Sequence, residues 1–261
     1  MFLRANLAAH GTHDTVSPHG TAFFVDETGS TISAVFGITN SGFVMAQAPK
    51  APVALWADFA ARITGRRVRG MTGVPEQVAA CLTALGLSEA SWQVHTDEPL
   101  YHLEIGQLIC DPVTVRKAVI EDLPMLENWF NGYEQDAGLA PVGTPPTEDV
   151  LARAARAIDS PDVMLLDHEG AAVSMAGINA RLPDIVQIGG VYTPAPLRGR
   201  GYARRALAGL LRACAAQGVT QSVLFANNEP AVRAYEALGY RLIGQYRVCV
   251  LQTPTVIGET S

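Results

Sequence analysis

The chain has 261 residues, of which 48% are hydrophobic and 17% charged, a balance that suits a globular protein with core enough for two modest domains. Its formal net charge of −6 is opposite to the basic surplus with which general nucleic-acid binders neutralise phosphates, so we expect no nucleic-acid partner. Cys81, Cys110, Cys214 and Cys249 are far apart and form no C-x-x-C pair, which argues against a zinc site.

The N-terminal residues 1–6 contain no sustained apolar stretch and no small-residue cleavage pattern. No uncharged run in the chain reaches the roughly 18 residues of a membrane span. We therefore expect a cytoplasmic protein without a membrane partner. His10, His13 and His19 lie in a polar stretch whose spacing has no metal geometry, so no metal cofactor is expected.

The first half of the chain predicts short strands followed by two helices. Apolar runs alternate there with turns that contain Gly29 and Gly42, a spacing typical of an antiparallel meander. Leu55, Trp56 and Phe59 then form one apolar face at helical spacing. We expect strands at residues 22–25, 32–38, 43–46 and 68–72, and helices at residues 52–64 and 75–85.

Residues 99–112 are predicted to form a transition, and the domains expected are 1–110 and 111–261. Pro and Gly mark a loop at residues 140–146. The other elements expected in the second domain are a strand at 113–118, a helix that begins at 121–124, a helix at 147–158, strands at 163–167, 172–180 and 185–192, a helix at 203–216, a strand at 222–225, a helix at 230–238 and strands within 240–251.

The sequence Arg-Gly-Arg-Gly-Tyr-Ala at residues 198–203 joins an apolar strand to a helix. Backbone N–H groups at a helix start have no intrahelical partners, so together with the helix dipole they can hold a pyrophosphate. Small residues at 199, 201 and 203 would let such a ligand approach the backbone, and the arginines around them add positive charge. The pattern favours a phosphate cradle, although tight loops of other kinds also need glycine.

A second segment carries Asn228, Ala231, Tyr235, Gly239 and Tyr240, which follow the pattern N-x-x-A-x-x-x-Y-x-x-x-G-[F/Y]. Residues 198–203 follow [Q/R]-x-x-G-x-[G/A], and the two segments occur in the order found in the GNAT superfamily of N-acetyltransferases. The second half therefore resembles a GNAT domain. The fold that this resemblance implies is α+β, with a mixed, mostly antiparallel central sheet flanked by helices.

The first half has a similar order of strands and helices but lacks both motifs. Its nearest approach, residues 69–73 before the helix at Pro75, does not have the family spacing. We expect a degenerate GNAT-like domain without a second CoA site, similar to the two-part bacterial acetyltransferases whose C-terminal half is catalytic.

The resemblance implies that acetyl-CoA is the cosubstrate and that an amine attacks its thioester directly within a ternary complex. Main-chain groups of the strand would pair with the pantetheine arm, and the loop would hold the pyrophosphate. The residues implied in cofactor binding are Val191, Tyr192, Thr193, Arg198, Gly199, Arg200, Gly201, Tyr202, Ala203, Arg204 and Asn228.

Tyr235 matches the position of the family's general acid, which protonates the CoA sulfur, although a tyrosine there can also be a core residue. Asn228 can equally serve as a helix cap. Glu134 lies in the helical region that borders the acceptor pocket of the family and is our candidate for the general base. A glutamate on a helix is also typical of a solvated surface. Glu134 is therefore either the general base or a surface residue without a role in catalysis.

Two other classes of protein fit some of these features. A regulatory protein could bind acyl-CoA without turnover; the presence of Tyr235 favours the enzyme, and the uncertain base favours the sensor. A Rossmann enzyme fits less well, because the loop lies late in the chain and G-x-G-x-x-G with a following acid is absent. The acceptor is expected to be a small-molecule or peptide amine; the acidic balance favours a cationic one, although net charge says little about a pocket. A homodimer is the commonest oligomer.

Overall fold

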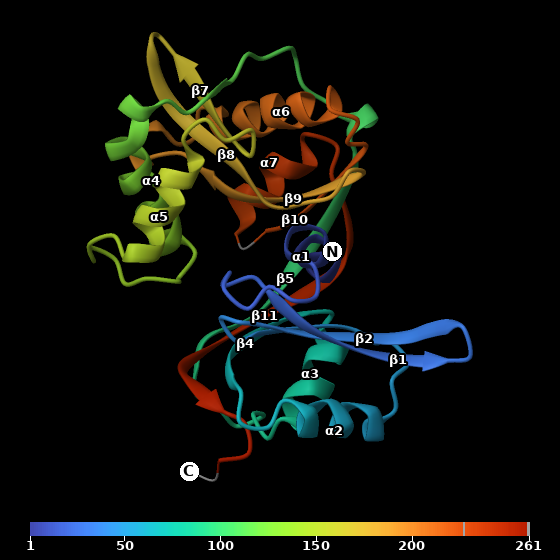
Figure 1. Ribbon diagram of the computed structural model, residues 1–261. Helices are drawn as coiled ribbons and strands as arrows, with labels where there is room; N and C mark the ends of the chain where they lie inside the picture. Colours follow the sequence, from blue (N-terminus) through green and yellow to red (C-terminus); the bar gives the residue numbers. More distant parts are fainter. Residues whose placement is uncertain (227, 260–261) are drawn as a thin grey trace. The chain divides into compact units, whose positions relative to one another are not determined.

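The computed structural model describes residues 1–226 and 228–259, with the backbone alone at Thr28. It consists of two compact units. Unit 1 contains Met1–Glu98 and Gln245–Ser261, and unit 2 contains Pro99–Gly244. Both units combine strands with helices, which confirms the predicted α+β class (Figure 1).

Unit 1 is built on strands in the order β1-β2-β3-β4-β11. β3 and β4 are parallel and the other neighbours are antiparallel. Helix α1 and the first part of β5, residues 92–98, were not predicted, whereas the elements between them lie where the sequence placed them. The elements are α1 (Phe2–His10), β1 (Thr21–Thr28), β2 (Thr31–Thr39), β3 (Phe43–Gln47), α2 (Val53–Arg62), β4 (Arg67–Gly73), α3 (Pro75–Ala84) and most of β11 (Arg241–Val256).

Side-chain alternation along β2 gives unit 1 two covered faces. Phe36 points toward the face that α2 and α3 cover, where its ring stacks on Phe59 at 4.8 Å and meets Trp56 edge-on at 5.0 Å. The next residue, Gly37, faces the other way, and a side chain there would collide with Leu3 of α1. The helices α2 and α3 and the helix α1 therefore pack on opposite faces of this sheet.

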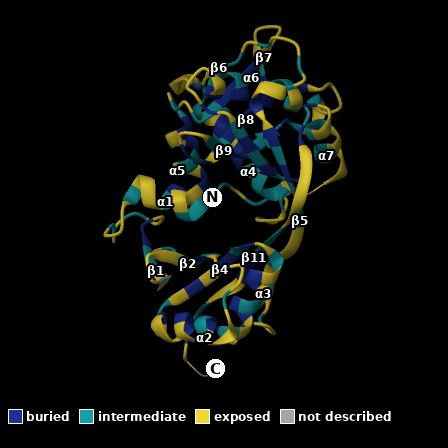
Figure 2. Ribbon diagram, turned by 90° about the vertical axis from the view of Figure 1, so that its right-hand side faces the viewer, coloured by how far each residue is buried: buried dark blue, intermediate teal, exposed yellow. Residues whose placement is uncertain are grey.

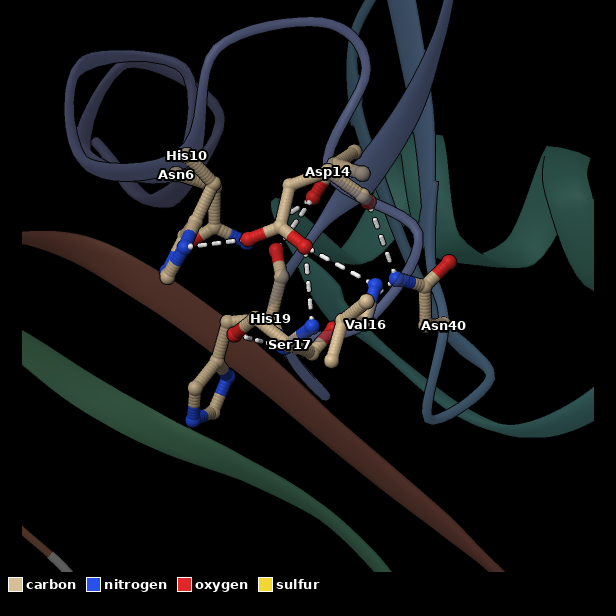
Figure 3. A network of polar contacts seen from close by, with 8 residues as sticks. Asn6, His10, Asp14, Val16, Ser17, His19 and Asn40 are labelled. Carbon is tan, nitrogen blue, oxygen red and sulfur yellow. Dashed lines mark hydrogen bonds and ion pairs between the residues drawn. The ribbon is translucent and has the colours of Figure 1, made fainter.

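A polar network holds the loop between α1 and β1 (Figure 3). One oxygen of Asp14 accepts hydrogen bonds from the N–H groups of Val16 and Ser17 at 2.9 and 2.8 Å, and its other oxygen lies 3.1 Å from His10 Nδ1. The Asn40 amide donates to the carbonyls of Asp14 and Ser17. The Ser17 N–H is the largest cause that holds the pKa of Asp14 below its ordinary value. His10 therefore contributes to a loop anchor.

Unit 2 has the strand order β5-β10-β9-β8-β7-β6, in which β9 and β10 are parallel and the other neighbours antiparallel. This is the mixed, mostly antiparallel sheet that the sequence predicts. The elements are the end of β5 (Trp92–Glu104), β6 (Arg116–Lys117), α4 (Leu123–Asp136), α5 (Glu148–Ala157), β7 (Val163–His168), β8 (Ala171–Arg181), β9 (Ile185–Tyr192), α6 (Tyr202–Ala215), β10 (Gln221–Phe225) and α7 (Glu229–Glu236).

Two apolar clusters cover the two faces of the unit 2 sheet. Met164 and Leu166 of β7 pack in the cluster that contains α6. Leu165, between them, packs in the cluster that contains α4 and α5. Because neighbouring residues of a strand point to opposite faces, α6 lies on one face and the α4–α5 pair on the other. Figure 2 shows the strands between them as mostly buried.

The two units divide after Glu98 and after Gly244, whereas the sequence suggested one boundary between residues 110 and 111. Residues 99–104, predicted as a transition, continue β5, and residues 100–104 pair antiparallel with β10 in unit 2. Residues 247–256 of β11 pair antiparallel with β4 in unit 1. Each unit thus completes its sheet with a strand whose chain begins in the other unit. The strand at 92–104 is poor in buried positions and contains Pro99, so its sequence has little strand pattern.

Candidate active site

The parallel strands β9 and β10 pair over only part of their length. Their register begins with Gln221 beside Ile185 and ends with Val223 beside Gln187. β9 continues to Tyr192 beyond this point. The two strands therefore diverge after Gln187, and β10 does not use the backbone groups of the last residues of β9.

A bulge lies in the same part of β9 on the side of β8. Gly189 and Tyr192 pair with β8 residues that are two positions apart, although they themselves are three apart. Gly190 has a φ of 71°, which is the left-handed region that favours glycine. Gly190 and Val191 are thus outside the register with both neighbours.

The end of β9 is fixed from β8 by Ser174, which is fully buried. Its hydroxyl donates to the carbonyl of Tyr192 at 2.9 Å and lies 2.8 Å from the hydroxyl of Thr193. The Thr193 carbonyl accepts from Arg198 Nε at 2.9 Å. These bonds hold the strand end in place directly after Val191, which has no register partner in β8 or β10.

The loop after β9 and the start of α6 form a cradle of backbone N–H groups, residues 198–204. Gly199 and Gly201 have φ angles of 77° and 76°, and Gly201 is the N-cap of α6. The first intrahelical bond runs from Arg205 N to Gly201 O at 3.1 Å, so the N–H groups of residues 202–204 have no intrahelical acceptor. No heavy atom lies within 4 Å of the position that a side chain on Gly199 would take. The cradle is therefore open, and its residues fit a pyrophosphate.

The side chains of the cradle have different surroundings. Tyr202 is buried, with its ring 5.2 Å from that of His168, so it can contribute only its backbone. Arg200 and Arg204 are exposed. A guanidinium nitrogen of Arg204 lies 3.8 Å from the position of a side-chain carbon on Gly201, which brings positive charge to the cradle.

Arg198 is held by α4. Its guanidinium lies 2.6 Å from the carboxylate of Asp136 and 5.7 Å from the centre of the Tyr192 ring. Burial raises the pKa of the Tyr192 phenol, and the Asp136 carboxylate adds to the rise. The sequence placed Arg198 among the phosphate-binding residues; in the structure its side chain also ties the cradle to the end of α4.

The helix α7 presents Tyr235 from beside β10. Asn228 caps this helix, because its side-chain oxygen accepts from Ala231 N at 2.9 Å. The Tyr235 ring lies 6.0 Å from that of Tyr240. Within the described residues, the Tyr235 hydroxyl forms no hydrogen bond. Burial raises the pKa of this phenol above its ordinary value, and the phenol of Tyr133 adds to the rise, so Tyr235 is a protonated donor at neutral pH.

Helix α4 brings further polar groups close to β9. Tyr133 is close enough to affect the pKa of Tyr235 on α7. Glu134 follows it and is half-buried. Gly132 lies against the hydroxyl of Tyr192, with no room for a side chain between them. The residues that the sequence proposed as acid and base are thus both in unit 2, on the helices α7 and α4.

A comparison with family models identifies the second half of the chain. Residues 123–240 match the acetyltransferase (GNAT) family. These residues form a GNAT acetyltransferase domain. The match extends from the start of α4 to Tyr240 and so includes the diverging strands, the cradle and α7. No curated protein matches the sequence.

Solved structures with low sequence identity share the fold over most of the chain. An acetyltransferase from the GNAT family of Colwellia psychrerythraea has a TM-score of 0.55 and 16% identity, with 89% of this chain and 86% of that chain covered. A GCN5-related N-acetyltransferase from Kribbella flavida has a TM-score of 0.54 and 20% identity, with 85% and 87% covered. Another from Sphaerobacter thermophilus has a TM-score of 0.52 and 15% identity, with 83% and 79% covered.

Arg153 of α5 is a residue of the GNAT domain that sequence reasoning missed. Its guanidinium carbon lies 4.7 Å from the centre of the Phe130 ring and 5.4 Å from that of Tyr133. Its Nη2 donates to Asn179 Oδ1 at 3.2 Å and lies 3.0 Å from the position of a side-chain carbon on Gly190. A cation therefore faces the bulge in β9.

Gln187 is a second residue that the sequence did not single out. It is buried at the point where β9 and β10 diverge. Its Oε1 has no hydrogen-bond partner among the described residues. A buried acceptor is costly unless a donor reaches it. No sequence signal distinguishes this glutamine from one on a solvated edge.

Unit 1 repeats the arrangement of strands around β3 and β4 without the cradle of the GNAT domain. These strands are parallel and α2 joins them, as α6 joins β9 and β10. The connection before α2 contains Pro49 and Pro52, which have no N–H, and the N–H of Ala48 already donates to Gln77 at 2.6 Å. Residues 69–73, the nearest counterpart in sequence, lie within β4. Unit 1 therefore offers few free donors to an anion.

The described residues contain no group of three or more His, Cys, Asp or Glu side chains that could hold a metal ion. Among the helices that the structure describes, none has both the length and the apolar character needed to cross a bilayer.

Proposed function

We propose that the GNAT domain is an acetyl-CoA-dependent N-acetyltransferase that acts on a primary amine by direct attack within a ternary complex. The observation that carries this proposal is the position of Val191. It lies outside both strand ladders, in the segment that leads directly to the cradle at Gly201. A pantetheine arm is an extended chain with amide groups, so it can pair with such freed main-chain groups while its pyrophosphate binds the helix start.

The proposed donor site has three parts. Val191, Tyr192 and Thr193 meet the pantetheine arm, and residues 198–204 hold the pyrophosphate. Asn228, already the cap of α7, has its second contact with the arm. In this arrangement the N–H of Val191 faces the thioester carbonyl, where it stabilises the negative charge that develops on the oxygen as the amine attacks.

Proton transfers complete the proposed reaction. The attacking amine forms a C–N bond as the C–S bond of the thioester breaks. Glu134 takes the proton that the nitrogen loses, directly or through a water molecule, and Tyr235 gives its proton to the departing sulfur. The apolar surroundings that raise the pKa of Tyr235 would also raise the pKa of the thiol beside it. The pKa values of the proton donor and of the proton acceptor therefore rise together.

Calorimetric titration with acetyl-CoA, followed by thiol release with a panel of primary amines, tests this function. We expect one equivalent to bind, because unit 1 has no comparable cradle, and thiol release to depend on an amine. Binding without amine-dependent release would favour an acyl-CoA sensor instead. A folded protein that binds no acetyl-CoA would contradict both.

A further inference from the structure

Two glycines of β9, Gly189 and Gly190, leave the space that Arg153 and its partner Asn179 occupy. Gly189 of β9 leaves the space that the Asn179 side chain fills, since any side chain on Gly189 would overlap that amide. Asn179 is itself the extra residue where the register of β8 shifts between Ile178 and Ala180. Its Oδ1 then accepts from Arg153 and turns the guanidinium toward Gly190. Two irregular strands thus fix the direction of one arginine.

The guanidinium has neutral groups at contact distance. Phe130 and Tyr133 lie under it, and one of its five N–H donors is used by Asn179 within the described residues. Burial lowers the pKa of Arg153, while Tyr133 and Glu134 act in the opposite direction. A partly desolvated cation with free donors is a strong binding site for a carboxylate, because guanidinium and carboxylate match in a two-bond geometry.

The position of Arg153 relative to the proposed reaction indicates which ligand it would bind. Gly190 directly precedes Val191, whose N–H we place at the thioester carbonyl. Helices α4 and α5 lie on the face of the sheet opposite α6. A group bound to Arg153 is therefore next to the acyl carbon and close to Glu134, which also contributes to the electrostatic environment of the arginine.

We propose that Arg153 binds a carboxylate of the acceptor and that the acceptor is an amine with a carboxylate close to it, as in a free α-amino acid. This inference rests on the proposed acetyltransferase function. The acceptor's carboxylate bonds to the free edge of the guanidinium, and its amine points toward the acyl carbon. The contact orients the nucleophile, so Arg153 is a specificity-determining residue and exchanges no proton.

The experiment compares wild-type protein with two variants of the same helix, using α-amino acids and the matched α-amino carboxamides as acceptors. Arg153→Gln removes the proposed carboxylate partner, and Arg156→Gln removes an exposed arginine three positions away. We expect wild type to prefer amino acids over their amides in kcat/KM. Arg153→Gln should lower kcat/KM for the amino acids about 30-fold or more and change that for the amides little. Arg156→Gln should resemble wild type.

A binding readout makes the test independent of turnover. With CoA present as the unreactive thiol, a bound amino acid should raise the Tm of wild type and of Arg156→Gln but not that of Arg153→Gln. Equal use of acids and amides by wild type would overturn the carboxylate assignment while leaving the acetyltransferase function intact. The same holds if only amines without a carboxylate are acetylated. A folded wild-type protein that does not bind acetyl-CoA would instead contradict the proposed function itself.

Discussion

The guanidinium of Arg198 lies 2.6 Å from the carboxylate of Asp136, and this ion pair joins the first residue of the cradle to the last residue of α4. Both side chains are about half exposed, so the pair itself adds little to stability. Its effect is positional, because Arg198 also donates to the carbonyl of Thr193 at the end of β9.

This geometry predicts that Arg198→Gln and Asp136→Asn weaken acetyl-CoA binding by a similar factor of about 3–10, because either change releases the loop. The dissociation constants can be measured by calorimetry at low and at moderate salt. If Arg198 acted only as a phosphate ligand, Asp136→Asn would free it and strengthen binding, which is the result that would contradict the positional role.

Tyr235→Phe removes the hydroxyl that we propose as the acid. It breaks no hydrogen bond among the described residues. We expect kcat to fall about 100-fold or more with an unchanged dissociation constant for acetyl-CoA. Tyr101→Phe is the matched control, since its hydroxyl lies 3.0 Å from Glu236 and is outside the proposed site. The control should lose stability and keep its kcat. An unchanged kcat in Tyr235→Phe would exclude the phenol as the acid.

Gly201→Glu and Gly218→Glu place the same side chain at the two ends of α6. Both glycines have positive φ, 76° and 91°, so both changes should cost about 1 kcal/mol of stability. Only Gly201→Glu brings bulk and negative charge to the cradle. We expect it to weaken acetyl-CoA binding at least 10-fold in calorimetry, with Gly218→Glu near wild type. Equal affinities of the two folded variants would argue against a pyrophosphate site there.

Asp97→Asn tests the ion pair between β5 and β11 in unit 1. Arg247 binds both oxygens of Asp97 at 2.5 and 2.7 Å, and these bonds hold the pKa of Asp97 below its ordinary value. A lowered carboxyl pKa stabilises the fold above the unfolded pKa of about 3.9, and this stabilisation is lost as pH falls through the folded pKa.

Urea unfolding should therefore show that Asp97→Asn is less stable than wild type by about 0.5–1 kcal/mol at pH 7, a value reduced by the partial exposure of both side chains. The difference should shrink below about pH 4. Asp58→Asn is the control, because its pair with Arg62 is more exposed. A difference that persists unchanged at low pH would contradict the charge-based explanation.

Much of this structure could be predicted from local patterns. The strands other than β5 and the helices α2 to α7 follow from apolar spacing and from turns such as Gly29 and Gly42. The cradle could be predicted because its function depends on backbone N–H groups at a helix start, which two glycines and a strand-to-helix junction reveal. Tyr235 could be proposed because a fixed spacing connects it to Asn228.

The features that could not be predicted depend on contacts between distant residues. Arg153 and Arg156 look alike in the sequence as polar positions of one amphipathic helix; only packing against Phe130 and the bulge at Gly190 distinguishes Arg153. The partner of a strand is not encoded in the strand itself. The residues of β5, of which few are fully buried, consequently gave no indication that the chain continues as a strand through residue 104.

The sheet of each unit contains a strand whose chain begins in the other unit, and this has a consequence for how the protein is made. During synthesis, β4 emerges early and can pair with β3, but its other neighbour, residues 247–256 of β11, is made much later. An unpaired strand edge is a site of aggregation. The nascent first unit therefore has an open strand edge until residues 247–256 have been synthesised. A gene split between residues 110 and 111 would produce two fragments that each lack a strand, and co-expression of both would be needed to recover either one.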